Sequence, residues 1–102
     1  MYISAYITCA NKEEAEKIAE ILVTEKLAAC VNYFPINSVY IWKGKVVKDS
    51  EYALLCKTKG ENFIKIKKRV SKVHSYEVPA ILAFEIASGN KAYLEWINDS
   101  IE

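Results

Sequence analysis

The side chains best suited to chemistry in this 102-residue sequence are a single histidine and three cysteines. His74 lies between a predicted helix and a predicted strand. Its neutral imidazole could ligate a metal, and a structural or solvated role stays open beside that one. Because each chain has one imidazole, a transition-metal site would need a cysteine, a carboxylate or a second subunit to complete it.

The three cysteines are Cys9, Cys30 and Cys56, an odd number without C-x-x-C spacing, which disfavours a disulfide framework and a structural zinc site. Each lies among apolar residues, so we expect small buried hydrophobic side chains in a reducing compartment. Cys9 is the open case, because it ends a predicted strand.

Two carboxylates and a lysine form a second candidate group. Glu51 precedes the third predicted strand, Glu77 precedes the fourth, and Lys57 lies within the third. Such a group could perform acid–base chemistry, but ion pairing that fixes a loop is the favoured interpretation. The G-x-S-x-G, P-loop, G-x-G-x-x-G and H-E-x-x-H signatures are all missing. The sequence therefore predicts a protein that is not an enzyme.

The stretch from 28 to 58 must position much of this chemistry, and it predicts a long β-hairpin. It is rich in β-branched and aromatic residues, and Lys43-Gly44 supplies a tight turn. A strand over 29–42 would be about 45 Å long, whereas a domain of this size has a radius of gyration near 13 Å. The hairpin should overhang its domain with apolar side chains on both faces, and such an arm needs another chain to cover it. We therefore expect a homo-oligomer.

The remaining elements follow from periodicity and capping signals. A strand is expected over 1–9, and a helix over 12–26 with Asn11 as its N-cap and Glu14 three residues later. Thr58 and Glu61 repeat that spacing before a second helix, and a final short helix starts at Gly89-Asn90. A fourth strand is expected over 78–86. The second helix has its apolar face on Phe63, Ile66, Val70 and Val73.

This order predicts an α+β fold of the ferredoxin-like type, β-α-β-β-α-β with a C-terminal helix, in a single domain over 1–102. Two helices would cover one face of a four-stranded antiparallel sheet. The other face, with Tyr2 and Tyr6, would lie bare in a monomer. Sister copies that pack on this face would remove it from water, and the same contact could cover the apolar side chains of the hairpin.

The composition of the chain limits the classes of partner that we expect. The chain is 52% hydrophobic and 26% charged with a net charge of +1, so no strong attraction to nucleic acid is expected. The basic face of the second helix is interpreted as solvated; it comprises Lys65, Lys68, Arg69 and Lys72. The first ten residues are too short for a membrane span and form a poor signal peptide. We expect a cytoplasmic protein with no membrane partner.

Several motifs in order resemble the CutA family of divalent-cation tolerance proteins over about residues 8–96. They are Leu27-Ala28-Ala29-Cys30-Val31-Asn32, Tyr40-x-Trp42-x-Gly44-Lys45, Lys57-Thr58, His74-Ser75-Tyr76-Glu77-Val78-Pro79 and Tyr93-Leu94-x-Trp96.

This resemblance implies a ferredoxin-like subunit in a homotrimer similar to the PII signalling proteins, and a role in tolerance to copper and other divalent metals. It implies Cys9 and His74 as candidate ligands for Cu(II), with no cofactor required. Ser75 stands where the family usually has proline, and Val73 precedes His74, so a histidine pair is missing. The alternative is a PII-like module that binds a small molecule or a protein in a polar pocket between subunits, near Glu51, Lys57, His74 and Tyr76.

Overall fold

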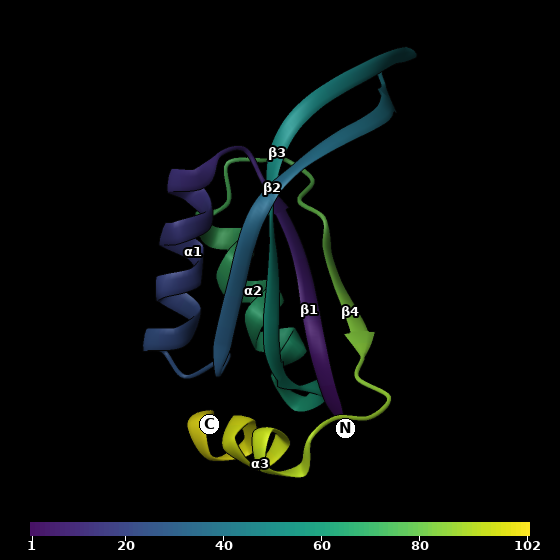
Figure 1. Cartoon of the computed structure of the whole chain (residues 1–102). Coiled ribbons are helices and arrows are strands. Elements are labelled where there is room, and N and C mark those ends of the chain that lie inside the picture. The colour runs from purple at the N-terminus through teal and green to yellow at the C-terminus, as the bar shows by residue number, and fades with distance from the viewer.

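The structure is a computed structural model that describes residues 1–102. It contains one four-stranded antiparallel sheet with strand order β2-β3-β1-β4 (Figure 1). This arrangement confirms the ferredoxin-like prediction. The elements are β1 (Tyr2–Cys9), α1 (Lys12–Thr24), β2 (Cys30–Trp42), β3 (Lys45–Lys59), a 3-10 turn (Gly60–Asn62), α2 (Phe63–Val73), β4 (Ile81–Glu85) and α3 (Lys91–Ser100).

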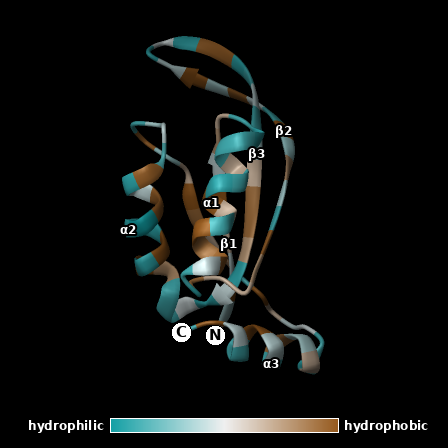
Figure 2. Cartoon of the chain, turned by 90° about the vertical axis from the view of Figure 1, so that its left-hand side faces the viewer, coloured by the Kyte–Doolittle hydropathy of each residue, from teal (hydrophilic) through white to brown (hydrophobic).

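The core lies between the sheet and the two helices α1 and α2, which cover the same face (Figures 1 and 2). Alternate residues of β1 point into it, as the period of two in a strand requires. The apolar stripes of both helices complete it, which confirms the helical spacing in the sequence. Its central members are Ala5, Ile7, Ala15, Ile18, Leu22, Leu54, Cys56, Ile66 and Val70.

The opposite face of the sheet is called here the open face, because neither α1 nor α2 covers it (Figure 2). It presents Tyr6 from β1 with Leu82 and Phe84 from β4. The Tyr6 and Phe84 rings lie 5.8 Å apart, and Leu82 and Phe84 are each 51% exposed. A neighbouring cluster of aromatic and aliphatic side chains at this exposure is typical of an interaction surface.

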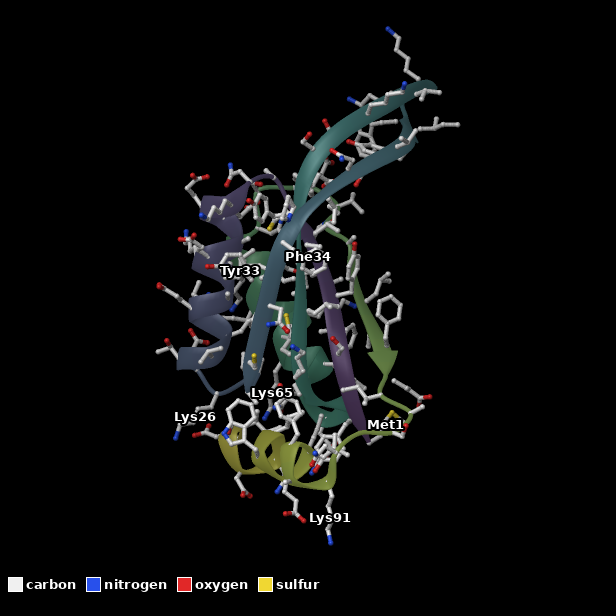
Figure 3. The ribbon with its side chains drawn as sticks, viewed as in Figure 1. Met1, Lys26, Tyr33, Phe34, Lys65 and Lys91 are labelled. Carbon is white, nitrogen blue, oxygen red and sulfur yellow. The ribbon has the colours of Figure 1, made fainter.

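The hairpin of β2 and β3 extends well beyond the body of the domain (Figure 1). The two strands pair along all 13 residues of β2, and the molecule is 45 Å long against 26 and 21 Å in its other dimensions. Lys43 and Gly44 both have positive φ, 51° and 77°, which is the type I′ turn that suits the twist of a hairpin. Val39 and Ile41 are exposed on this arm, and its tip extends away from the body (Figure 3).

Helix α1 ends at Thr24, two residues before the predicted end. Lys26 adopts a left-handed conformation with φ of 58°. Its N–H donates to the carbonyl of Val23, and the N–H of Leu27 donates to the carbonyl of Leu22. These two bonds form a Schellman motif, with a lysine at the position where glycine is usual.

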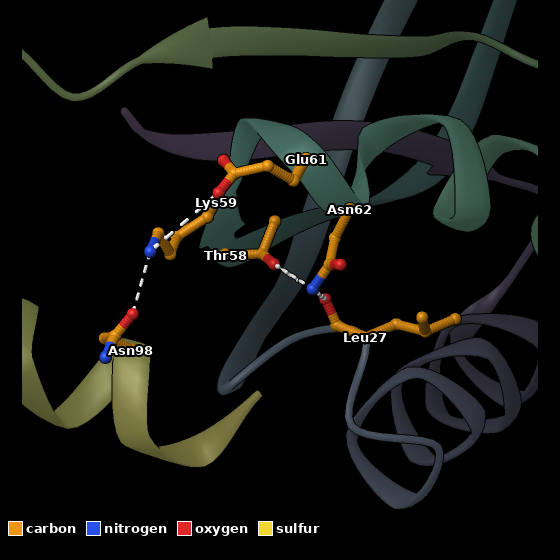
Figure 4. Close-up of polar contacts among 6 residues, drawn as sticks. All are labelled: Leu27, Thr58, Lys59, Glu61, Asn62 and Asn98. Atoms are coloured by element: carbon orange, nitrogen blue, oxygen red, sulfur yellow. Dashed lines mark hydrogen bonds and ion pairs between the residues drawn. The ribbon is translucent and has the colours of Figure 1, made fainter. Parts of the chain in front are cut away.

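The predicted capping box at Thr58 is wrong, because this residue lies in β3 and is fully buried. Its hydroxyl donates to the carbonyl of Leu27 at 2.7 Å. The Asn62 amide donates to that hydroxyl at 3.2 Å and to the same carbonyl at 3.3 Å (Figure 4). Helix α2 begins only at Phe63, after the 3-10 turn. This buried network joins the end of β3 to the turn that follows α1.

Strand β4 covers residues 81–85, so the predicted strand over 78–86 was too long at its start. The N–H of Thr8 donates to the carbonyl of Ala80, which is the last bond to β1 on that side. Pro79 has no N–H to continue the ladder. Val78 and Ala80 instead line a cleft beside the hairpin.

None of the three helices is both long and apolar enough to cross a membrane.

Candidate functional site

A cleft of about 500 Å³ lies at the base of the hairpin, and we call it the hairpin cleft. One wall comes from β2 and β3 and the other from the loop between α2 and β4, with the end of β1 at its floor. Its lining residues are Thr8, Tyr40, Trp42, Asp49, Glu51, Ser75, Tyr76, Glu77, Val78 and Ala80.

Two tyrosine–carboxylate pairs organise the hairpin cleft. The Tyr76 hydroxyl donates to Glu51 Oε2 at 2.6 Å, which ties the loop to β3. The Tyr40 hydroxyl donates to Asp49 Oδ2 at 2.5 Å, within the hairpin. Burial and the Glu51 hydrogen bond raise the pKa of Tyr76, and the Asp49 hydrogen bond raises the pKa of Tyr40. Both phenols therefore stay protonated donors, and both carboxylates keep free acceptor positions.

His74 lies behind the hairpin cleft, with both ring nitrogens engaged. Nδ1 accepts the N–H of Tyr76 at 3.0 Å, so Nε2 carries the proton and donates to the carbonyl of Thr8 at 2.7 Å. The His74 and Tyr76 rings are in contact, with centroids 4.8 Å apart and their planes tilted by 51°. A metal bound at either nitrogen would replace one of these hydrogen bonds.

Cys9 is fully buried at the end of β1, and its thiol donates to the carbonyl of Tyr52 at 3.7 Å. Burial, together with the nearby charges of Glu14 and Glu51, raises the pKa of Cys9 to about 12. A metal ion would therefore have to displace the proton of this buried thiol in order to bind the thiolate. No three or more histidine, cysteine or acidic side chains are grouped so as to hold one metal ion.

Glu14 holds the loop that carries His74. One carboxylate oxygen accepts the N–H of Ala10 at 2.9 Å and the hydroxyl of Ser75 at 3.0 Å, and the other accepts the N–H of Ser75 at 2.8 Å. Asn11 accepts the N–H of Glu14 at 2.9 Å, which confirms it as the N-cap of α1. Burial raises the pKa of Glu14, but these hydrogen bonds outweigh it and leave the pKa below its usual value.

We expect Glu14→Gln to lower the free energy of unfolding by about 1 kcal/mol at pH 7, because a neutral amide accepts these bonds more weakly than a carboxylate does. The lowered pKa makes the contribution of Glu14 complete above the pKa of the unfolded side chain, roughly 4.3. It is lost as the pH falls from there through the folded pKa. Urea unfolding at pH 7 and pH 3.5 measures both effects.

Glu13→Gln is the matched control, because Glu13 lies in the same first turn of α1 but is exposed. It should change the free energy of unfolding by less than about 0.5 kcal/mol at either pH. A Glu14→Gln deficit of the same size at both pH values would show that the charge of this carboxylate does not hold the loop.

The predicted group of Glu51, Glu77 and Lys57 does not form. Glu51 and Glu77 both line the hairpin cleft. Lys57 lies six residues further along β3, on the open face, and donates to Asn32. The prediction of an ion pair was therefore wrong for the lysine.

Sequence reasoning missed Tyr40, Trp42 and Asp49 as part of this site. The signal that could have found them is the Lys43-Gly44 turn, because it fixes the register of the hairpin. That register places Tyr40 opposite Val47, and therefore on the same face as Asp49 two residues on.

Comparisons with known proteins place these features in a family. Residues 3–100 match the family model described as CutA1 divalent ion tolerance protein. The chain is 44% identical to a divalent-cation tolerance protein CutA from Archaeoglobus fulgidus over all of both chains. It is 48% identical to one from Thermus thermophilus over 92% of each.

Solved structures agree with this assignment. The fold superposes on the periplasmic divalent cation tolerance protein CutA from Archaeoglobus fulgidus with a TM-score of 0.98 at 44% identity, covering all of both chains. It superposes on CutA1 from Oryza sativa with a TM-score of 0.96 at 42% identity, covering 99% of this chain and 94% of that one. The chain therefore belongs to the CutA1 divalent ion tolerance protein family.

Proposed function

We propose that the chain acts in copper tolerance as a non-enzymatic homotrimer, in which sister copies cover the open face and the hairpin. The observation that carries the assembly is the exposed apolar surface of the open face, continued by an arm that overhangs the body (Figures 1 and 2). The resemblance in sequence supports three copies.

Light scattering of the wild-type protein over a dilution series tests the assembly. We expect a mass of three chains of 11.6 kDa that persists on dilution, because aromatic surface on each copy would be removed from water. A stable monomer of 11.6 kDa that stays in solution would contradict the proposal.

Cu(II) is the metal that we propose, with Cys9 and His74 as its ligands. Support comes from their shared position, since His74 bonds to the carbonyl of Thr8, the residue before Cys9. A thiolate and an imidazole are a suitable donor pair for copper. Metal binding would then open the loop, because His74 must release Thr8 or Tyr76 to ligate it.

Titration of Cu(II) into wild type and His74→Ala tests this pair. We expect the affinity to fall by at least the roughly tenfold that removal of an outer-shell partner costs. Cys30→Ala is the control, because Cys30 lies on β2, away from this site, and should leave the affinity unchanged. Equal binding by wild type and His74→Ala would reject His74 as a ligand.

We also propose a cytoplasmic location. All three cysteines are free, as suits a reducing compartment, although the related Archaeoglobus fulgidus protein is described as periplasmic. Immunodetection of the protein in fractionated cells of its source organism tests the location, and recovery outside the cytoplasmic fraction would contradict it.

A further inference from the structure

We propose that the outer face of α2 docks a short acidic segment of a partner protein. The outer face is the side of α2 that is turned away from the sheet, and its exposed residues are Ile64, Lys65, Lys67, Lys68, Ser71 and Lys72. The inference goes beyond the proposed function and does not depend on it, because α2 covers the side of the sheet opposite the open face (Figure 2). Sister copies that pack on the open face are expected to leave the outer face of α2 in contact with water.

The charged residues of α2 are all positive. Its eleven residues include four lysines and one arginine, and none of them is acidic. Arg69 is paired with Glu25 at the end of α1, at a distance of 2.9 Å, whereas none of the four lysines is in an ion pair within the chain. The lysine ammonium groups of the outer face are therefore free to bind carboxylates from another molecule.

The spacing of these positive charges works against the helix itself. Like charges four residues apart on a helix repel each other and destabilise it. Lys65 and Arg69 have this spacing, and so do Lys68 and Lys72. Glu25 relieves the repulsion only at Arg69. Carboxylates of a partner would relieve it at the lysines as well, so the arrangement favours an acidic partner.

An exposed apolar side chain lies among the lysines. Ile64 is 64% exposed, and Lys68 and Ser71 follow it by four and seven residues, which places the three in one row along the outer face. An inorganic anion would leave Ile64 in water. A protein segment that carries apolar residues between its carboxylates can cover Ile64 while its acidic groups pair with the lysines.

The neighbouring helix limits the width of the partner. Helix α1 covers the same side of the sheet as α2, and Glu13, Glu16 and Glu20 follow one another along its solvent-facing side (Figure 2). Of these, only Glu16 is in an ion pair, with Lys12 at 3.9 Å. A bilayer surface or a nucleic-acid duplex is wider than one helix, so its phosphates would also meet these carboxylates. A single acidic segment can lie along α2 alone.

Fluorescence anisotropy with a labelled acidic peptide tests the class of partner. The probe repeats Leu-Glu-Glu-Leu-Asp-Glu-Glu twice, and its matched control has glutamine for each glutamate and asparagine for each aspartate. We expect the acidic peptide to bind at least about tenfold more tightly than the control peptide at low salt. Raising sodium chloride from about 0.02 to about 0.15 M should weaken its binding by about threefold or more.

Two double variants locate the binding. Lys68→Gln with Lys72→Gln removes two charges from the outer face, and we expect about fivefold weaker binding of the acidic peptide. Lys17→Gln with Lys91→Gln is the matched control, because it removes two exposed lysines from α1 and α3 and changes the net charge equally. It should change the affinity by less than about twofold.

Two further measurements complete the test. Ile64→Ala should weaken binding by about threefold, whereas Val23→Ala, at a side chain on α1 that is also exposed, should leave it unchanged. A labelled oligothymidylate with the same number of negative charges should bind more weakly than the acidic peptide. Equal binding of the two peptides, equal losses in the two double variants, or tighter binding of the oligothymidylate would overturn the proposal. Light scattering of the same samples separates these results from the number of copies in the assembly.

Discussion

Replacing Phe84 with glutamate is expected to convert the proposed homotrimer into single chains of 11.6 kDa. Phe84 is half-exposed in the single chain and lies 5.8 Å from the ring of Tyr6. If a sister copy covers the open face, the substitution places an unpaired carboxylate in an apolar contact. Burial of an unpaired charge costs several kcal/mol, and this cost is repeated in every copy of the assembly. Sedimentation velocity at several concentrations measures the change in mass.

Ile64→Glu is the control for this prediction. Ile64 is also an exposed apolar residue, but it lies on α2, on the side of the sheet away from the open face. Its replacement should leave the mass unchanged. Far-ultraviolet circular dichroism of both variants reports whether the subunit stays folded. A folded Phe84→Glu variant with the wild-type mass would show that the open face is not the interface.

The second large effect is expected from Ile66→Ala, which should lower the free energy of unfolding by about 2 to 5 kcal/mol. Ile66 is fully buried on α2 and packs in the core. Its truncation loses the transfer free energy of the removed carbons and leaves a cavity between helix and sheet. Denaturant unfolding measures the loss, at equal chain concentration because an oligomer gains stability by mass action.

Ile64→Ala separates burial from residue type, because the same residue two positions earlier is 64% exposed. It should change the free energy of unfolding by no more than about 0.5 kcal/mol. Similar losses for the two alanine variants would mean that α2 does not pack as described.

Elements with strong local signals could be predicted from the sequence. The alternation of β1, the Asn11 cap of α1 and the Lys43-Gly44 turn each depend on a few adjacent residues, and the structure confirms all three. The prediction of Thr58 as a helix cap was wrong because its hydroxyl donates to the carbonyl of Leu27, which is 31 residues away in the sequence. A local capping pattern contains no information about such a partner, and burial in β3 decided the outcome.

The site was predictable only in part, for the same reason. Motifs singled out Cys9 and His74, but the bonds that engage them come from Tyr52, Thr8 and Tyr76, brought close by the sheet and the loop. Glu51 was expected near a strand end, whereas its hydrogen bond to Tyr76 depends on where the loop between α2 and β4 lies relative to β3. Side chains that meet through tertiary structure leave no spacing rule in the sequence.

The continuous ladder between β2 and β3 restricts how this protein can change in evolution. Strands β2 and β3 run from the body of the domain into the arm as one uninterrupted antiparallel pair. A one-residue insertion in either strand would exchange the inner and outer faces beyond it. Natural variants should therefore lengthen or shorten the arm by two residues in each strand, next to the turn, and insertions of odd length should be rare there.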